Sequence, residues 1–350
     1  MTGRLVGDFV VIDDPKEGNQ IYNKGNYGYP RSGGGLDLDL TEATYLSECR
    51  RIEVVDENGP VSFHDLFIHA ARLINGFDIR YMVYQDLRSR GFVVKMETGD
   101  YDMSVFPRGK TMSNSRPQYY VRAISERNAV DVSEFVKEAY DAERHKKNLL
   151  YGIVDEEGDL TYYTLSMKDP YGEVFSERTD RKPVGVLISD RVFVMDPEDA
   201  ESILRSGFFG KRVGDMLQLS LIESSYLLVK GRMSVVDNEG AEIDYDRLTE
   251  IGESMQDEFE LREEVFSDLR DRGLVVKAGF KYGTHFRVYN GSPDDSHAKY
   301  LVHAVSDKDI RMWPEISRTV RLSGGVKKDI LFGRVHKGRV QYLEFKWYRP

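Results

Sequence analysis

Three side chains in the last quarter of the chain could together cleave a phosphodiester without a metal: Tyr289, His297 and Lys328. Cleavage of RNA by its own 2′-hydroxyl needs a base for that hydroxyl, an acid for the 5′-oxygen and a cation for the crowded phosphate. Histidine suits the acid because its unperturbed pKa lies near neutrality. Tyrosine, with a pKa of about 10, needs a neighbouring cation to act as the base, and lysine supplies one. Each residue alone is more often structural or solvent-exposed, so the set needs a second observation.

That second observation is an internal duplication. Residues 77–95 match residues 259–277 at eleven of nineteen positions, with an offset of 182. Fainter matches extend the repeat in both directions: 21–29 with 203–211, 42–59 with 223–240, and 145–158 with 326–338. The chain is therefore two copies of one unit, at about 1–170 and 185–350. The polar stretch between them contains Pro170 and Pro183, which predicts a linker at 171–184.

The two copies differ at the positions that could do chemistry. The tyrosine and histidine of the second copy are absent from the first, whereas the lysine is shared: the matched pairs are Tyr289 and Phe106, His297 and Arg116, and Lys328 and Lys147. Duplicated units share folding requirements, so a difference between them indicates divided labour. The joint loss of tyrosine and histidine favours a catalytic second copy and a degenerate first copy.

The last turn of each copy carries the opposite charge. The first copy reads IVDEEGD at residues 153–159 and is acidic at Asp155 and Glu157, whereas the second reads RVHKGR at residues 334–339. Two solvated hairpin tips whose charge has drifted would explain this difference. The alternative is an acidic tip that docks into a basic groove, in this chain or in a second copy.

Composition narrows the class of protein. The chain has 350 residues, a formal net charge of −10 and one cysteine, Cys49, which excludes an internal disulfide framework and a multi-cysteine zinc site. No apolar run approaches the ~18–20 residues of a membrane span, and no signal-peptide core is visible, so we expect a cytoplasmic protein without a membrane segment. No metal-ligand cluster stands out, and we expect no cofactor. Residues 321–350 hold eight basic and two acidic side chains, which fits either a solvated strand and turn or a polyanion site.

The hydrophobic pattern gives each copy a mixed α/β fold, with an N-terminal α/β module followed by a nuclease-like module built on a mixed sheet. Apolar residues recur at three-to-four spacing from Leu248 to Leu269, which predicts a helical region at 244–272 and its counterpart at 62–90. Arg272-Gly273 is typical of a helix end. Further helices are expected at 41–50, 222–231 and 310–322, strands at 7–14, 184–195, 273–279, 284–290, 299–306, 330–335 and 341–348, and a flexible loop at the Gly-rich residues 26–40.

The second copy resembles the catalytic repeat of archaeal tRNA-splicing endonucleases, also called tRNA-intron endonucleases. The resemblance rests on LVVKAGFKYGTHFRVYNG at 274–291, DDSHAKYLVHAV at 294–305 and VRLSGGVKKDILFGRV at 320–335. Residues 197–211, PEDAESILRSGFFGK, resemble the family's N-terminal module. Because the likeness covers 185–350 and, more faintly, 1–170, it implies the fused two-repeat, homodimeric type.

The resemblance implies a role for each candidate residue. It makes Tyr289 the general base, His297 the general acid and Lys328 the phosphate-stabilising cation. Lys327 is adjacent to Lys328 and is the alternative if the alignment slips by one residue. Arg321 matches an arginine that clamps a bulged base by stacking and charge.

Two further features follow from the resemblance alone. Lys346 and Arg349 are both candidates for the second residue of the base clamp. Asp155 and Glu157 match the family's acidic interface loop, which sits in a basic pocket of the partner's catalytic unit and helps to form the dimer. The implied substrate is precursor tRNA with a bulge–helix–bulge, cut without metal to leave 2′,3′-cyclic phosphate and 5′-hydroxyl ends.

The expected domains follow the same division. Residues 1–170 are expected to form a degenerate structural repeat, 185–270 the N-terminal module of the catalytic repeat, and 271–350 the catalytic nuclease module. The main alternative is a catalytically inactive RNA-binding or structural subunit of such an endonuclease. A metal-dependent nuclease using Asp294 and Asp295 is a second, which chelator would distinguish, and a pure oligomerisation scaffold is a third.

Overall fold

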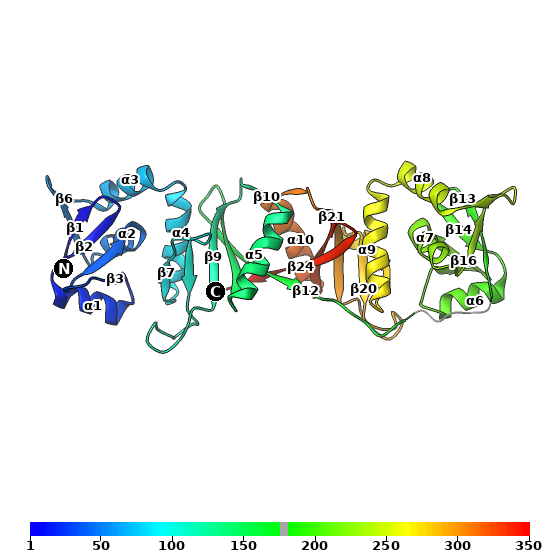
Figure 1. Ribbon diagram of the computed structural model, residues 1–350, viewed down its shortest axis with the longest axis horizontal. Helices are drawn as coiled ribbons and strands as arrows, with labels where there is room; N and C mark the ends of the chain where they lie inside the picture. The colour runs from blue at the N-terminus through cyan, green and yellow to red at the C-terminus, as the bar shows by residue number, and fades with distance from the viewer. Residues whose placement is uncertain (176–180) are drawn as a thin grey trace.

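The structure is a computed structural model that describes residues 1–175 and 181–350. The middle of the predicted linker, 176–180, lies outside the described residues. The molecule is elongated, with one N-terminal module at each end and a single large sheet between them (Figure 1). The mixed α/β fold and the tandem duplication are therefore confirmed.

Each N-terminal module is a six-stranded sheet, counted over the described residues, with helices packed against it. The first has the strand order β3-β4-β2-β1-β5-β6 and comprises β1 (Thr2–Val6), β2 (Phe9–Ile12), α1 (Pro15–Gly25), β3 (Tyr29–Pro30), β4 (Leu36–Asp39), α2 (Leu40–Glu48), β5 (Glu53–Asp56), β6 (Gly59–Val61) and α3 (Phe63–Leu73). The second repeats this order with β13 (Val184–Ile188), β14 (Arg191–Val194), α6 (Pro197–Arg205), β15 (Lys211–Val213), β16 (Met216–Ser220), α7 (Leu221–Val229), β17 (Ser234–Val236), β18 (Glu242–Ile243) and α8 (Tyr245–Met255).

The two nuclease modules share one sheet, which has ten strands within the described residues, in the order β19-β20-β21-β23-β24-β12-β11-β9-β8-β7. The first module comprises α4 (Phe77–Ser89), β7 (Val94–Met96), β8 (Met103–Val105), β9 (Tyr119–Ser125), β10 (Ala129–Asp131), α5 (Val132–Arg144), β11 (Asn148–Val154) and β12 (Leu160–Lys168). The second comprises α9 (Phe259–Asp271), β19 (Val275–Ala278), the 3-10 turn η1 (Phe280–Tyr282), β20 (Phe286–Tyr289), β21 (Tyr300–Ser306), β22 (Ile310–Met312), α10 (Trp313–Gly325), β23 (Asp329–His336) and β24 (Arg339–Tyr348).

The repeats meet at the antiparallel pair β12 and β24, where Leu165 lies opposite Phe345. Beside this pair, Trp313 of the second repeat is 1% exposed and packs between aromatic rings of the first. Its ring stacks on Tyr163 at a centroid distance of 6.3 Å and meets Phe135 edge-on at 5.6 Å. Since side chains of both repeats form this core, the repeats stabilise each other.

Each repeat also fastens its N-terminal module to its first sheet strand through a buried carboxylate. Glu223 caps α7 and accepts hydrogen bonds from the Gly210 N–H at 2.9 Å and the Lys277 ammonium at 3.4 Å. In the first repeat Glu42 and Lys95 make the same contacts. Burial raises the pKa of Glu42 and lowers that of Lys95, because each charge has left water.

The predicted helical regions at 62–90 and 244–272 are confirmed, but each is two helices rather than one. The break falls where the backbone turns left-handed, at Gly76 (φ 69°) and at Glu258 (φ 57°). The helix predicted at 310–322 begins at Trp313, because residues 310–312 form β22 and pair with β10. The Gly-rich segment 26–40 contains the short paired strands β3 and β4 and is not simply a loop.

Candidate active site

The three candidate residues lie where β20 ends and where β21 and β23 begin, at one end of the strands of the large sheet. This end of the strands is hereafter called the edge. Tyr289 is the last residue of β20, and the loop that follows returns as β21, whose Tyr300 lies opposite Val288. The Lys299 N–H donates to the Val288 carbonyl at 2.9 Å. Lys328 precedes β23, whose Asp329 lies opposite Tyr300. The end of β20 and the starts of β21 and β23 therefore meet.

Direct contacts tie these residues together. The Lys328 ammonium donates a hydrogen bond of 3.1 Å to the carbonyl of Ala298, which directly follows His297. Tyr289 is 7% exposed and shares a small buried cluster with Ala298 and Val275. His297 is exposed to solvent. Lys328 and Tyr289 therefore both contact Ala298, the residue that follows His297, and the imidazole of His297 is open to solvent.

The first repeat builds the same frame without the same chemistry. The Lys147 ammonium donates a hydrogen bond of 2.5 Å to the Pro117 carbonyl, as Lys328 does to Ala298. Pro117 follows Arg116, which occupies the position of His297. Phe106, 5% exposed, takes the place of Tyr289. The lysine contact is therefore common to both repeats, and the tyrosine and histidine distinguish the second.

The predicted cations near the site differ in their surroundings. Arg321 is exposed on α10, and its Nη2 lies 3.3 Å from the Thr161 hydroxyl of the first repeat. Lys327 is exposed, and its backbone is left-handed (φ 54°) just after the helix. Both side chains are free to meet an anionic ligand from solvent.

Lys346 and Arg349, the two candidates for the second residue of the base clamp, have different surroundings. Although burial opposes its charge, the carboxylates of Glu344 at 3.1 Å and Asp329 at 3.7 Å raise the pKa of Lys346. The Tyr342 hydroxyl bonds to Asp268 of α9, so Lys346, four residues on, belongs to the α9 face of β24.

Trp347, two residues after Phe345, belongs instead to the face of β24 that is covered by α10, and just beyond the strand follows Arg349. Its guanidinium lies 4.1 Å from the ring centroid of Trp347, which is 47% exposed. Sequence reasoning missed Trp347. The sequence did contain a signal. When the apolar face of a strand ends in an aromatic residue close to an arginine, that aromatic ring is expected to be exposed.

The two hairpin tips keep their opposite charges in part. In the acidic tip, the Asp155 carboxylate accepts from the backbone N–H groups of Glu157 and Asp159 and shapes the turn. The Glu157 side chain points into solvent. In the basic tip, Asp307 pairs with Arg334 and with His336. Glu156 of the acidic tip pairs with Arg127, so both tips are partly neutralised, and the exposed Glu157 carboxylate is the charge that the acidic tip presents.

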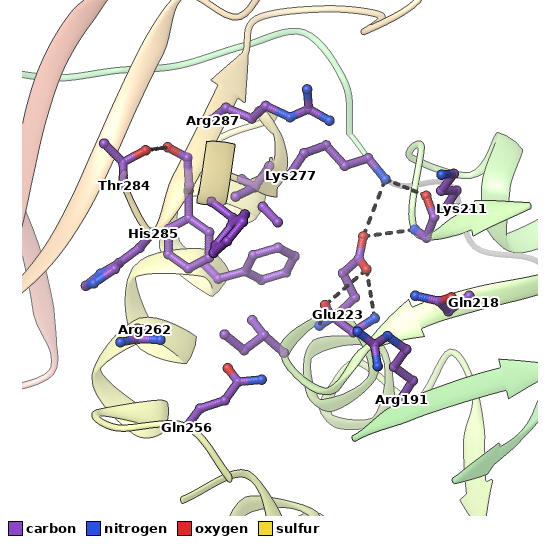
Figure 2. A pocket seen from close by; sticks show the side chains of 18 residues that line it. Arg191, Lys211, Gln218, Glu223, Gln256, Arg262, Lys277, Thr284, His285 and Arg287 are labelled. Atoms are coloured by element: carbon purple, nitrogen blue, oxygen red, sulfur yellow. Dashed lines mark hydrogen bonds and ion pairs between the residues drawn. The ribbon is translucent and has the colours of Figure 1, made fainter. Parts of the chain in front are cut away.

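A basic groove of about 750 Å³ opens between the N-terminal and nuclease modules of the second repeat (Figure 2). Its basic side chains among the described residues are Arg191, Lys211, Arg262, Lys277 and Arg287, and its one carboxylate is Glu223. Figure 2 shows Arg191 and Lys211 on one wall and Arg262 and Arg287 on the other. Phe280, 91% exposed, lies at the groove.

Two of these five basic residues are retained in the first repeat, as Arg80 and Lys95, but the other three are replaced by uncharged residues. Strand register matches Arg191 with Phe9, Lys211 with Tyr29, and Arg287 with Ser104. Tyr29 bridges the two modules there, because its hydroxyl donates a hydrogen bond of 2.6 Å to the Met96 carbonyl. Sequence reasoning missed the groove, since its residues are spread over almost a hundred positions. Comparing charges between the two copies would have found it.

Two partly buried histidines lie at this groove, and one of them, His285, lines it. His285 accepts a hydrogen bond from the Ala304 N–H through Nδ1, and its ring is 5.2 Å from that of His303. Burial, with the nearby Arg262 and Arg311 adding to it, lowers the pKa of His285 to about 3 and that of His303 to about 4. Both rings are therefore neutral at physiological pH.

No group of three or more His, Cys, Asp or Glu side chains in 1–175 and 181–350 is arranged to hold a metal ion. No helix of the described chain has both the length and the apolar character that crossing a membrane requires.

Comparison with known protein families finds a match for both modules of each repeat. The model of the tRNA intron endonuclease catalytic C-terminal domain matches residues 77–162 and 259–342. The model of the tRNA intron endonuclease N-terminal domain matches residues 1–67 and 184–249. The chain is 35% identical to a tRNA-splicing endonuclease of Methanococcoides burtonii over 98% of both chains. It is also 35% identical to that of Methanosarcina acetivorans over 98% of both chains, and 30% identical to that of Haloferax volcanii over the whole of both.

The partly buried histidine pair predicts acid sensitivity. Because the folded-state pKa values of His285 and His303 lie below the unfolded value of about 6.5, their contribution to stability is complete above that pH and is lost as pH falls toward 4. We expect each to cost about 1–2 kcal/mol of the free energy of unfolding between pH 7 and pH 5. Urea unfolding of His303→Phe, which keeps a ring on Phe332, should show a flatter pH dependence than the native chain.

The exposed His64 provides the control, because His64→Phe makes the same chemical change where no ring is buried. The prediction is contradicted if the two variants follow the same pH dependence.

Proposed function

Because the chain belongs to the tRNA-intron endonuclease family, we propose that it excises introns from precursor tRNA at the edge that carries Tyr289, His297 and Lys328. One observation carries the assignment of this edge. Both repeats hold their lysine against the same loop carbonyl, but at the matched positions only the second has a tyrosine and a histidine, where the first has Phe106 and Arg116. The retained frame with altered side chains supports catalysis in the second repeat and a structural role for the first.

The reaction follows from which of the three side chains can accept a proton, which can donate one and which carries a positive charge. Tyr289 accepts the proton of the substrate's 2′-hydroxyl, the 2′-oxygen forms a bond to phosphorus, and the bond from phosphorus to the 5′-oxygen breaks. His297 donates a proton to that leaving oxygen. Lys328 stabilises the negative charge that gathers on the non-bridging oxygens. The products are a 2′,3′-cyclic phosphate and a 5′-hydroxyl, and the atoms balance without a metal or a water molecule.

The substrate proposed is a bulge–helix–bulge. His297 is exposed while Tyr289 is largely buried, so a splayed single-stranded nucleotide can reach the site more readily than a paired one. Arg321, on α10, supplies a guanidinium for an unstacked base. Arg349 is the better second clamp candidate than Lys346, because its guanidinium lies against Trp347 on the α10 face, whereas Lys346 is already paired with two carboxylates.

The functional unit proposed is a homodimer joined by charge. Each chain has one acidic tip, with Glu157 exposed, and one basic groove in the described residues, lined by Arg191 and Lys211. Two chains related by a two-fold axis can each insert the acidic tip of the first repeat into the partner's groove. The basic tip of the second repeat would be repelled there. The resulting dimer has two active edges, which suits the two junctions of one intron.

Single-turnover cleavage of a bulge–helix–bulge RNA in EDTA tests the catalytic assignment. Tyr289→Phe and His297→Ala should each lower the rate about 10²–10⁴-fold, because each removes a proton-transfer group. Binding of uncleaved RNA should change little. Arg116→Ala, the same truncation at the matched position of the first repeat, should leave the rate near the native value. Equal losses in Arg116→Ala and His297→Ala would refute the division of labour, and cleavage that requires added metal would refute the mechanism.

The dimer is tested by reversing one charge on each surface. Glu157→Lys should weaken association at least tenfold, since it brings a cation to a basic groove, and sedimentation equilibrium measures this directly. Lys211→Glu in the same chain should restore much of the loss. Glu239→Lys, on another exposed turn, is the matched control and should stay dimeric. A native chain that is monomeric at micromolar concentration would overturn the proposal.

A further inference from the structure

The chain that joins the two repeats is bonded to the edge of the proposed active site. Residues 169–175 leave β12 and run along the lower edge of the sheet toward β20 (Figure 1). Three successive backbone N–H groups of this segment, those of residues 172–174, donate to the second repeat. Their acceptors are the carbonyls of Arg272 at 3.0 Å, Asn290 at 3.0 Å and Gly273 at 2.8 Å. Asn290 directly follows Tyr289, so the segment is attached next to the proposed base.

A side chain of the same segment also packs against the cluster that contains the tyrosine. Val174 packs against the buried cluster formed by Val275, Tyr289 and Ala298, together with Phe208 of the N-terminal module. Ala298 is also the residue whose carbonyl receives the Lys328 ammonium. Val174 therefore touches the cluster that holds the phenol and anchors the lysine.

The contact is so close that it requires glycine on both sides. A Cβ on Gly172 would lie 2.3 Å from the Gly273 carbonyl oxygen and 2.8 Å from that of Asn290. Gly273 has φ +77°, and a Cβ there would lie 2.7 Å from the Gly172 carbonyl oxygen. These neighbours are backbone atoms, so they cannot move aside cheaply.

The first repeat has no such segment in the described chain. Gly91 matches Gly273 in position and has a similar φ of +87°, yet no described atom lies within 4 Å of a Cβ built there. The difference follows from chain order, because the linker precedes the second repeat and nothing in the described chain plays that part for the first. The tyrosine and histidine are kept in the repeat that receives the linker.

We propose that residues 172–174 are positioning residues that hold Tyr289 and the loop leading to His297 in place for catalysis. The inference rests on the proposed function of Tyr289. The linker's backbone fixes Asn290, its valine fixes the phenol ring, and the Asp169–Arg272 ion pair holds the start of the segment. The covalent joint between the repeats is thus part of the active-site support rather than a passive tether.

Two variants of the full chain test the positioning role, and each is measured by hydrogen exchange and by single-turnover cleavage. Gly172→Ala forces the linker away from Gly273, and Val174→Ala removes the seal while leaving the backbone intact. The controls are Gly99→Ala, which has open space and no positive φ, and Val229→Ala, whose side chain is exposed. Hydrogen exchange of residues 286–298 reports the order of the edge without any need for cleavage. Single-turnover cleavage at saturating RNA reports the catalytic rate, and the RNA concentration at half-maximal rate reports binding.

We expect both test variants to exchange faster at 286–298 and to lose about tenfold to 100-fold in rate, because misplacement by about 1 Å costs roughly 100-fold. RNA binding should be unchanged, and both controls should behave as the native chain. Unchanged exchange in Gly172→Ala would overturn the contact. Faster exchange with a native rate, or a loss confined to binding, would overturn the positioning role.

These outcomes separate the inference from the proposed function. If Tyr289→Phe cleaves normally, the proposed base is wrong and the positioning role falls with it, whatever the exchange result. If Tyr289→Phe is inactive while Gly172→Ala and Val174→Ala keep the native rate, the proposed function stands and the positioning role fails.

Discussion

The antiparallel pairing of β12 with β24 is the interaction on which the rest of the molecule depends. Residues Tyr162–Lys168 lie opposite Tyr342–Tyr348, and this ladder satisfies the backbone groups of two strands that would otherwise be exposed edges. It also encloses an aromatic core around Trp313 that uses rings from both repeats. A repeat alone would expose both the edge and half of that core. The first repeat therefore contributes to the fold of the second, which agrees with the structural role proposed for it.

This dependence frees the two repeats to diverge elsewhere. Their lysines keep the same bond to a loop carbonyl, and their capping glutamates keep the same bond to the module junction. Around these shared contacts the chemistry differs: Phe106 against Tyr289, and Tyr29 against Lys211 in the groove. The differences gather on the second repeat as the proposed active edge and a basic groove. They gather on the first as an acidic tip, so each repeat supplies what the other lacks.

Sequence alone predicted the duplication, the order of modules and the candidate edge, because identity at a fixed offset and strand periodicity are local signals. It did not predict that the long helical regions break, since Glu258 adopts a left-handed backbone that glycine usually supplies. It also could not choose between Lys346 and Arg349, because the face of β24 is set by Asp268 on a distant helix. The groove and the Gly172 contact were missed for the same reason, as both join residues far apart in the chain.

The central claim is that two repeats share one frame and that the second alone performs chemistry. The most direct measurement compares Lys328→Ala with Lys147→Ala for thermal stability and for single-turnover cleavage of a bulge–helix–bulge RNA in EDTA. Both variants lose the same hydrogen bond to a loop carbonyl, so the account predicts similar losses of stability, about 1 kcal/mol each. It predicts that Lys328→Ala loses at least 100-fold in rate and that Lys147→Ala loses almost none. Equal losses of rate in the two variants would contradict it.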